Sequence, residues 1–282
     1  MFYLFFLLFF ILGTIIGSFL NVVVLRYGTK TLSGRSLCFS CGKALRWFEL
    51  VPLVSFFIQK GRCRGCKSGI SWQYPLVELT TGLIFAAIFW KHLSLLSLFS
   101  YSVILSLVIQ LLLWSLLIAL SVYDIRHKII PDTLVYSACL IALFLFLISY
   151  FLSSIASPRD LIAGPLLSAP FAALWFFSKG RAMGLGDAKL ILLFPWFLGL
   201  AKGLSALIIG FWLGAAVSLG ALFLKSAVNY LPRRCCPTFR GKLKHLGMKT
   251  EFPLGPFLVL GLLLVYLFSF DVTGLSLLLQ NS

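Results

Sequence analysis

Two of the eight acidic residues of this 282-residue chain stand where carboxylates could work as a pair. Asp124 ends one apolar run, Asp187 opens another, and 63 positions with two further apolar runs lie between them. Two helical passages return a chain to the end of a bundle from which it left, so both carboxylates are expected at one end. Carboxylates that share a site cannot both ionise easily, and such a pair can activate water while it polarises a carbonyl. If the two meet, they predict peptide hydrolysis by an aspartic mechanism.

The residues around Asp187 form a short motif that suits this chemistry. Gly184 and Gly186 precede the aspartate as Gly-x-Gly-Asp, and Lys189 follows it. Glycine lets the backbone turn tightly and lets an extended substrate approach closely. A packing glycine pair, with Asp187 as the N-cap of the next helix, is the structural alternative. The motif is too short to decide between these two interpretations.

The other acidic residues on the same side divide into one functional candidate and several structural ones. Glu78 lies at the start of an apolar run, where an unpaired carboxylate is costly and is therefore a candidate for function. Asp132 follows Pro131 and is expected to be the N-cap of the next helix. Glu49 and Glu251 lie among cations and are expected to be solvated partners of ion pairs, which contribute little stability.

Four of the seven cysteines form two Cys-x-x-Cys pairs, Cys38 with Cys41 and Cys63 with Cys66, separated by 21 residues. Four thiolates can hold Zn²⁺ tetrahedrally, and a short segment with little core gains folding free energy from the metal. Such a closed site would be structural. A disulfide framework or a redox pair is the alternative, and a cytoplasmic location disfavours it because thiols stay reduced there. The spacing therefore predicts a small zinc-ribbon-like loop.

The composition indicates which structural elements must position these residues. The chain is 60% apolar, contains 28 Phe and has a mean hydropathy of +1.03, which excludes both a soluble globular domain and a disordered chain. Nucleic-acid binding is also excluded, because the chain has little soluble surface to offer. We expect an all-α polytopic membrane protein with about eight transmembrane helices of about 20 residues each. The apolar runs lie at 2–25, 76–90, 96–122, 132–152, 161–178, 187–200, 203–224 and 254–270.

The charges predict the orientation of these spans. There are 24 Lys and Arg against 8 Asp and Glu, a formal net charge of +16. With eight spans, all cations except Lys91, Arg159 and Lys202 fall on one face, which the positive-inside rule makes cytoplasmic. Both termini are then periplasmic, and Asp160 and Asp271 lie on the outer face. The first apolar run has no cation before Arg26 and no cleavage site, so it is expected to be a retained span and not a signal peptide.

We therefore divide the chain into a first span at 1–26, a cytoplasmic cysteine loop at 27–75 and a membrane core at 76–282. Within the core, the segment 226–252 is a long basic loop for which attraction to anionic lipid headgroups is the modest expectation. Cys235 and Cys236 in that loop are expected to be reduced thiols near the membrane. Cys139, inside an apolar run, is expected to be a packed core residue.

Together these motifs resemble the type IV prepilin leader peptidases, the bifunctional prepilin peptidase/N-methyltransferases of pilus and type II secretion systems. The resemblance runs from about residue 13 to about residue 260. Besides the two cysteine pairs, the matching segments are 17–26, 52–56, 61–63, 70–78, 124–132, 183–190 and 252–257. Several moderately specific motifs in the right order carry the resemblance.

The resemblance implies more than the spacing does. Such enzymes cleave the short basic leader of prepilins and pseudopilins after a glycine, at the cytoplasmic side of the bacterial inner membrane. They then methylate the new N-terminal residue, usually Phe, with S-adenosylmethionine. By this resemblance, Asp124 and Asp187 match the catalytic aspartates, and the four cysteines of the loop match the metal ligands. Asn21 and Glu78 fall in motifs associated with methylation.

Three other interpretations remain open at the level of the sequence. One is a peptidase of the same family without an active methyltransferase. Another is a transporter or channel in which Glu78, Asp124 and Asp187 line an ion path, although no internal repeat is evident. The third is a non-catalytic assembly protein that docks partners through the zinc loop. The identity of the substrates, the oligomeric state and the geometry of a cofactor site do not follow from the sequence.

Overall fold

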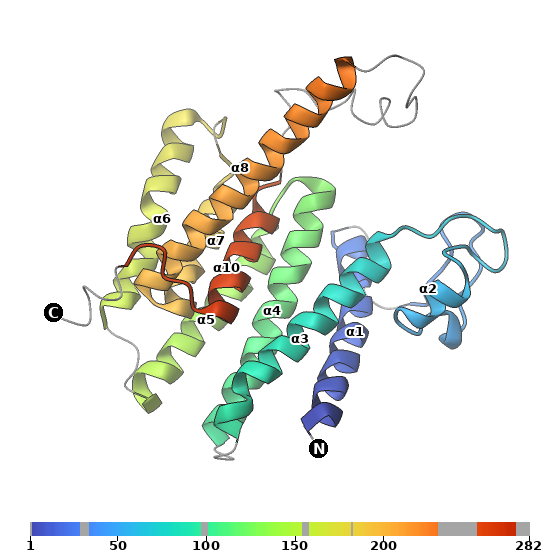
Figure 1. The fold of residues 1–282 in the computed structure, drawn as a ribbon, viewed down its shortest axis with the longest axis horizontal. Helices are drawn as coiled ribbons and strands as arrows, with labels where there is room; N and C mark the ends of the chain where they lie inside the picture. The colour runs from blue at the N-terminus through green and yellow to red at the C-terminus, as the bar shows by residue number, and fades with distance from the viewer. Residues whose placement is uncertain are drawn as a thin grey trace. The chain divides into compact units, whose positions relative to one another are not determined.

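The structure, a computed structural model, describes residues 2–28, 34–96, 101–153, 158–181, 183–230 and 253–274. Within them the chain is helical, with no strand and only two isolated β-bridges (Figure 1). The long helices are α1 (Phe2–Arg26), α3 (Gln73–Leu96), α4 (Tyr101–His127), α5 (Asp132–Ser153), α6 (Pro158–Ser178), α7 (Leu185–Leu198), α8 (Leu200–Tyr230) and α10 (Gly255–Phe268). The expected all-α fold is confirmed.

The chain divides into two compact units, Met1–Val122 and Tyr123–Ser282. In the first unit α1 packs along α3, and small residues let the two backbones approach. A Cβ on Gly13 would lie 2.7 Å from the carbonyl oxygen of Thr81, and one on Gly17 would lie 2.9 Å from Cα of Glu78. Close packing at small residues is how helices associate in lipid, where burial of apolar surface supplies no driving force.

The cysteine segment between α1 and α3 has little regular structure. It contains the short 3₁₀ helix η1 (Trp47–Glu49) and the five-residue helix α2 (Val54–Ile58). The two antiparallel bridges, Leu37 with Ala44 and Arg62 with Gly69, each close a loop around one cysteine pair. Two loops of the same design are what a zinc ribbon requires, so this segment is compatible with the predicted zinc-ribbon-like loop.

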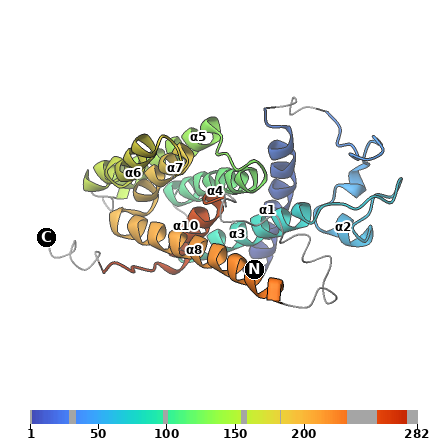
Figure 2. The same ribbon diagram turned by 90° about the horizontal axis from the view of Figure 1, so that it is seen from above.

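In the second unit α7 is the central helix. It packs against α5, α6, α8 and α10. In Figure 2 the helices of this unit form two groups, α5, α6 and α7 in one and α8 with α10 in the other. The first turn of α7 carries Asp187. Its far end turns sharply at Gly199, whose φ of +82° favours glycine, and leads directly into α8. This far end is therefore separated from Asp187 by the whole length of α7.

Two aspartates of the predicted outer face stabilise that far end. Asp160 accepts a hydrogen bond from the backbone N–H of Leu200, the first residue of α8, at 2.8 Å. Asp271 accepts hydrogen bonds from the side chains of Ser205 and Thr273, at 3.3 and 2.8 Å. Both carboxylates thus lie around the start of α8, while the start of α7 carries Asp187. Asp160 and Asp271 therefore lie at the end of α7 opposite to Asp187.

Each predicted apolar run coincides with a helix, but the helices differ in length. Six of them are long and apolar enough to cross a membrane: α1, α3, α4, α5, α6 and α8. The helices α7 and α10 have only 14 residues each. The number of eight spans therefore stays a prediction. Helix α8 continues to Tyr230, so the start of the predicted loop 226–252 is helical; Cys235, Cys236, Glu251 and the rest of that loop lie outside the described residues.

Candidate active site and metal centre

Asp124 lies in the last turn of α4 and is buried, with 5% of its surface exposed. Its Oδ2 accepts a hydrogen bond from the backbone N–H of Gly255, the first residue of α10, at 3.0 Å. A Cβ at position 255 would lie only 2.7 Å from that oxygen, so a larger residue would push the carboxylate aside. The start of α10 therefore fixes one oxygen of Asp124.

Asp187 lies in the first turn of α7 and is partly exposed. Its carboxylate accepts a hydrogen bond from the backbone N–H of Gly184 and is close enough to Asp124 for the two like charges to interact. Ile130 completes the arrangement: a Cβ on Gly186 would lie 2.7 Å from Cβ of Ile130, and one on Gly255 would lie 3.4 Å from its Cδ1. The structure thus brings the two predicted aspartates together at one end of the second unit.

The two carboxylates differ in environment, as a catalytic pair requires. Asp124 is buried and held by a backbone donor, whereas Asp187 is open to the surroundings on one side. Neighbouring carboxylates repel each other when both are ionised, so a pair of this kind favours the state in which one of them is protonated. That state can deprotonate a water molecule and at the same time donate a hydrogen bond to a carbonyl oxygen.

The glycines of the motif have distinct places. Gly186 packs on Ile130, while Gly184 is exposed and precedes α7 as its N-cap in an extended conformation. The interpretation of Asp187 as N-cap of α7 is therefore wrong, since Asp187 lies inside the helix and position 184 is the cap. The other part of the structural alternative, a packing role for the glycines, is right for Gly186, which packs against Ile130.

Lys189 and Asp132 meet across two helices. The Lys189 Nζ donates to Oδ1 of Asp132, the first residue of α5, at 2.7 Å. The expected role of Asp132 as N-cap is not what the structure shows: α5 starts from the carbonyl of Pro131, which accepts the N–H of Val135 at 3.1 Å, and the carboxylate turns to Lys189. A carboxylate in the first turn is also favourable towards the helix dipole.

The four cysteines of the loop converge on one point. The Sγ atoms of Cys38, Cys41, Cys63 and Cys66 all lie within 4.8 Å of one another. Zn–S bonds of about 2.3 Å in a tetrahedron place sulfurs about 3.8 Å apart. The Sγ atoms of Cys38 and Cys66 are 3.8 Å apart, so this donor set fits a tetrahedral metal ion.

The two cysteine loops have the same backbone hydrogen bonds. The N–H of Cys38 donates to the carbonyl of Lys43 and that of Cys63 to the carbonyl of Ser68, both at 2.9 Å. In each loop the fourth residue after the first cysteine has positive φ, +70° at Gly42 and +60° at Lys67. Such turns leave both sulfurs of a pair on the inner side, which explains how the sequence builds one half of a metal site twice.

At two of the four cysteines, Cys38 and Cys66, local hydrogen bonds favour the thiolate form that a metal needs. Backbone N–H groups of Cys41 and Ser40 lower the pKa of the Cys38 thiol to about 6. The hydroxyl and backbone of Ser68 likewise lower the pKa of Cys66, whose Sγ lies 3.1 Å from Ser68 Oγ.

Glu49 joins the first cysteine loop to η1. It is buried, with 7% of its surface exposed, accepts the N–H of Arg46 at 2.8 Å and pairs with Lys43 at 3.6 Å. The Arg46 N–H, and then the charges of Lys43 and Arg64, lower the pKa of this carboxyl. The expectation of a solvated surface pair is therefore wrong, because the segment folds over Glu49 and makes it part of its small interior.

Asn21 and Glu78 lie together between α1 and α3. Asn21 is almost fully buried, and its Nδ2 donates to the carbonyls of Gly17 and Tyr74, at 3.3 Å each. Glu78 is buried too, and its Oε2 accepts the N–H of Leu53 at 2.8 Å. Leu53 has a φ of +58°, a conformation that costs free energy in a non-glycine residue. Asn21 thus ties α1 to the start of α3, and Glu78 ties the cysteine segment to α3.

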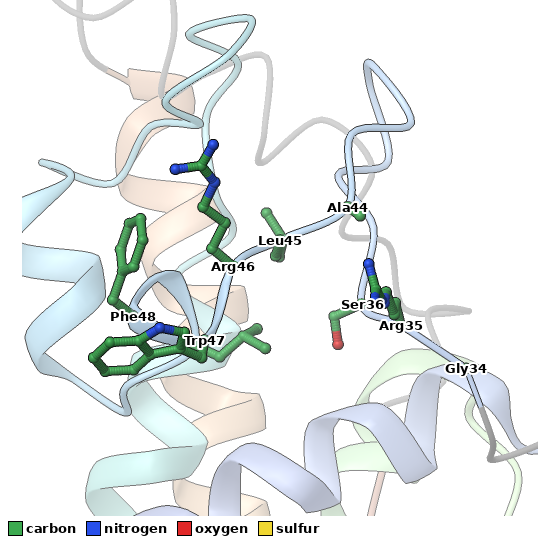
Figure 3. Close-up of a pocket in the computed structure, with 9 residues that line it drawn as sticks. Gly34, Arg35, Ser36, Ala44, Leu45, Arg46, Trp47 and Phe48 are labelled. Carbon is green, nitrogen blue, oxygen red and sulfur yellow. The ribbon is translucent and has the colours of Figure 1, made fainter.

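An open hollow of about 740 Å³ lies beside the first cysteine loop (Figure 3). Trp47 and Phe48 line one side of it, and Arg35 with Ser36 line another. Trp47 is 80% exposed, so its indole is free to stack on a planar group. The hollow therefore combines an aromatic surface with cationic side chains.

Sequence reasoning did not assign a role to Gly255, Ile130 or Leu53. Each acts through its backbone or through close packing, which residue type alone does not reveal. The position of Gly255 gives a signal in retrospect, because a glycine that opens an apolar run at the aspartate end allows close approach of a backbone N–H. The expectation for Cys139 is confirmed: it is 5% exposed within the core.

Comparisons with known proteins agree with this geometry. The model of the bacterial peptidase A24 N-terminal domain matches residues 11–92, and that of the type IV leader peptidase family matches 111–219. Three curated relatives are named prepilin leader peptidase/N-methyltransferase. The relative from Myxococcus xanthus is 34% identical, over 77% of this chain and 62% of its own length. The relative from Stutzerimonas stutzeri is 30% identical, over 80% of this chain and 68% of its own length. The relative from Bacillus subtilis is 30% identical, over 84% of this chain and 83% of its own length. No solved structure matches the chain.

Proposed function

Because this chain belongs to the type IV prepilin leader peptidase family, we propose that it cleaves the leader of prepilins or pseudopilins and then N-methylates the new N-terminal residue. The match covers 62% of the first relative's length, so the activity of that whole protein is carried here as a proposal. The observation that supports it best is the meeting of Asp124 and Asp187 at one end of the second unit.

In the proposed cleavage the two aspartates share one proton. The ionised carboxylate removes a proton from water, and the protonated one polarises the scissile carbonyl. The resulting tetrahedral intermediate collapses when the leaving amine takes up a proton. Gly184, exposed and extended, leaves room for the substrate backbone beside Asp187.

The first prediction concerns these carboxylates. Asp124→Asn and Asp187→Asn each keep the shape of the side chain but remove the shared proton, so leader cleavage falls by about 10³-fold or more in both. Purified protein in nanodiscs and a prepilin substrate, followed by mass spectrometry, measure this. The same spectra show whether the N-terminus gains a methyl group.

Two outcomes of that experiment would contradict the proposal. Full cleavage by both folded variants would exclude the aspartic mechanism and favour the transporter or assembly interpretation. Cleavage by the unchanged protein without any methylation would leave the second candidate, a peptidase whose methyltransferase part is inactive. The Gly220→Ala variant, at an exposed site on α8 with no atom within 4 Å of the new Cβ, serves as a folding control.

For methylation we assign the first unit. The four cysteines would hold a structural Zn²⁺, which cross-links the segment without an open position for chemistry. Asn21 and Glu78 are the methylation-linked residues, Glu78 as the group that orients the amine or accepts its proton. When bound, S-adenosylmethionine supplies the methyl group. The hollow beside Trp47 and Arg35 supports a place for it, since an indole can stack on adenine and a guanidinium can pair with a carboxylate.

The location follows from the family and the charge distribution. We propose a multi-pass protein of the bacterial inner membrane, with the active site at the cytoplasmic face and both termini in the periplasm. Prepilins and membrane lipid are the proposed partners, and nucleic acid is not one. The division into a first span at 1–26, a cysteine loop at 27–75 and a peptidase core at 76–282 belongs to the same proposal.

A further inference from the structure

Lys189 lies on a different side of α7 from Asp187. Positions i and i+2 of an α-helix are about 200° apart, so the two side chains leave the helix in nearly opposite directions. The lysine side chain is only 18% exposed, and its ammonium is 2.7 Å from the Asp132 carboxylate. An ammonium so placed cannot serve the aspartate pair directly and must act on α5.

One face of α5 holds this lysine at three points. Asp132 binds the ammonium, the ring of Tyr136 lies under it at 4.9 Å, and the Sγ of Cys139 donates to the Lys189 carbonyl at 3.5 Å. The three α5 residues are spaced i, i+4 and i+7, which places them on the same side of the helix. Both the side chain and the backbone of Lys189 are therefore fixed to α5.

Packing fixes the same side of the first turn of α7, because Gly186 lies three residues before Lys189 and therefore on nearly the same face. Gly186 fits against Ile130, two residues before Asp132, and Ile130 also lies against Gly255, whose N–H holds Asp124. One face of the first turn of α7 is thus held both by the segment that leads into α5 and by α5 itself. A rotation of α7 about its axis would break the ion pair and would move Asp187 relative to Asp124.

We propose that the Asp132–Lys189 ion pair is a positioning device for the cleavage reaction, which sets the rotation of α7 and so the approach of Asp187 to Asp124. The inference rests on the proposed function. Asp132 is 64% exposed in its side chain, and ion pairs of this kind contribute little to overall stability. Its effect lies in geometry, where a small displacement of a reacting group can cost about 10²-fold in rate.

A double-mutant cycle tests this. Lys189→Met, Asp132→Asn and the double variant are compared for kcat and KM of leader cleavage in nanodiscs. We expect kcat to fall by about 10- to 100-fold in both single variants, with KM within about twofold of the unchanged protein. The double variant should be no slower than Lys189→Met, because either change alone removes the same contact.

Recovery of kcat by compensating substitutions distinguishes a positioning role of the ion pair from a direct role of Lys189 in catalysis. Lys189→Arg keeps a cation beside Asp132, and Asp132→Lys combined with Lys189→Asp restores the pair in reverse; both should recover most of kcat. Lys202→Met removes a cation from α8 and leaves the α5–α7 pair intact, so it should cleave at the unchanged rate. Thermal unfolding of each variant shows which of them are folded.

Each other result would overturn the inference. Full activity of Asp132→Asn with loss in Lys189→Met would mean that the lysine acts without its partner. Three further results would overturn the inference. They are additive losses in the double variant, no rescue by a folded protein with the reversed pair, and an effect confined to KM. Absence of cleavage by the unchanged protein would overturn the proposed function together with this inference, whereas cleavage by that protein with an additive cycle overturns the inference alone.

Discussion

Gly255 shows how the candidate site depends on a residue with no side chain. Its N–H donates to Asp124 at 3.0 Å, and its lack of a Cβ leaves the space that the carboxylate occupies. An anionic oxygen is well placed at the N–H groups that open a helix, because these donors have no partner within the helix. The aspartate end of α4 and the first turn of α10 therefore form one structural element of the site.

We predict that Gly255→Ala lowers the rate of leader cleavage by about 10²-fold, since the new methyl group would displace Oδ2 of Asp124. Single-turnover kinetics measure the effect. Gly220→Ala introduces the same methyl group where no atom lies within 4 Å and should leave the rate unchanged. Equal activity of the two variants would show that the glycine does not set the position of Asp124.

At the scale of elements, the cysteine segment is held by two kinds of contact. The four sulfurs form one centre within 4.8 Å, and buried Glu49 links the first loop to η1 through Arg46 and Lys43. The segment also contacts α3 through the hydrogen bond from Leu53 to Glu78. All of these residues belong to the first unit, whereas Asp124 and Asp187 belong to the second.

Because the cysteine segment and the aspartate pair belong to different units, loss of the metal is predicted to affect methylation and cleavage to different extents. Cys63→Ser removes one thiolate, so zinc affinity should fall more than tenfold and methylation should suffer more than cleavage. Metal analysis of the purified protein and mass spectra of the processed pilin measure both. Cys139→Ala, which removes a cysteine outside the cluster, should keep its zinc. Equal loss of methylation and cleavage in Cys63→Ser would mean that the segment supports the fold of both units.

At the scale of the whole molecule, the distribution of charge determines how the chain is expected to lie in the membrane. Only Lys91, Arg159 and Lys202 among 24 cations fall in the predicted outer loops. Within the second unit, Asp160 and Asp271 gather at the start of α8, the end of α7 opposite to Asp187.

We predict that Arg159 faces the periplasm and Lys128 faces the cytoplasm. Alkaline phosphatase is active only after export, so fusions that end at position 159 should be active and fusions that end at position 128 inactive. A cytoplasmic reporter fused at the same two positions should give the reverse pattern and serves as the control. Activity of the phosphatase at position 128 would reverse the proposed orientation.

The sequence by itself determined the class of fold and the chemistry available to it. Apolar runs must become helices in lipid, because every backbone polar group there needs an internal partner, and each predicted run coincides with a helix. Eight acids leave few candidates for a catalytic pair, and the spacing of the cysteines predicts the four-sulfur site that the structure brings together. Residue type and spacing were sufficient to name these candidates.

Only the tertiary structure decided which residues serve these groups. Periodicity states which side of a helix a residue occupies but not which helix it meets, so the contact of Gly255 with Asp124 could not be read from the chain. The same holds for Asp132, which binds Lys189 and is not an N-cap, and for Glu49, which the cysteine segment buries. Partners distant in sequence are set by the packing of whole helices and loops, where close approach at a few small residues fixes the register.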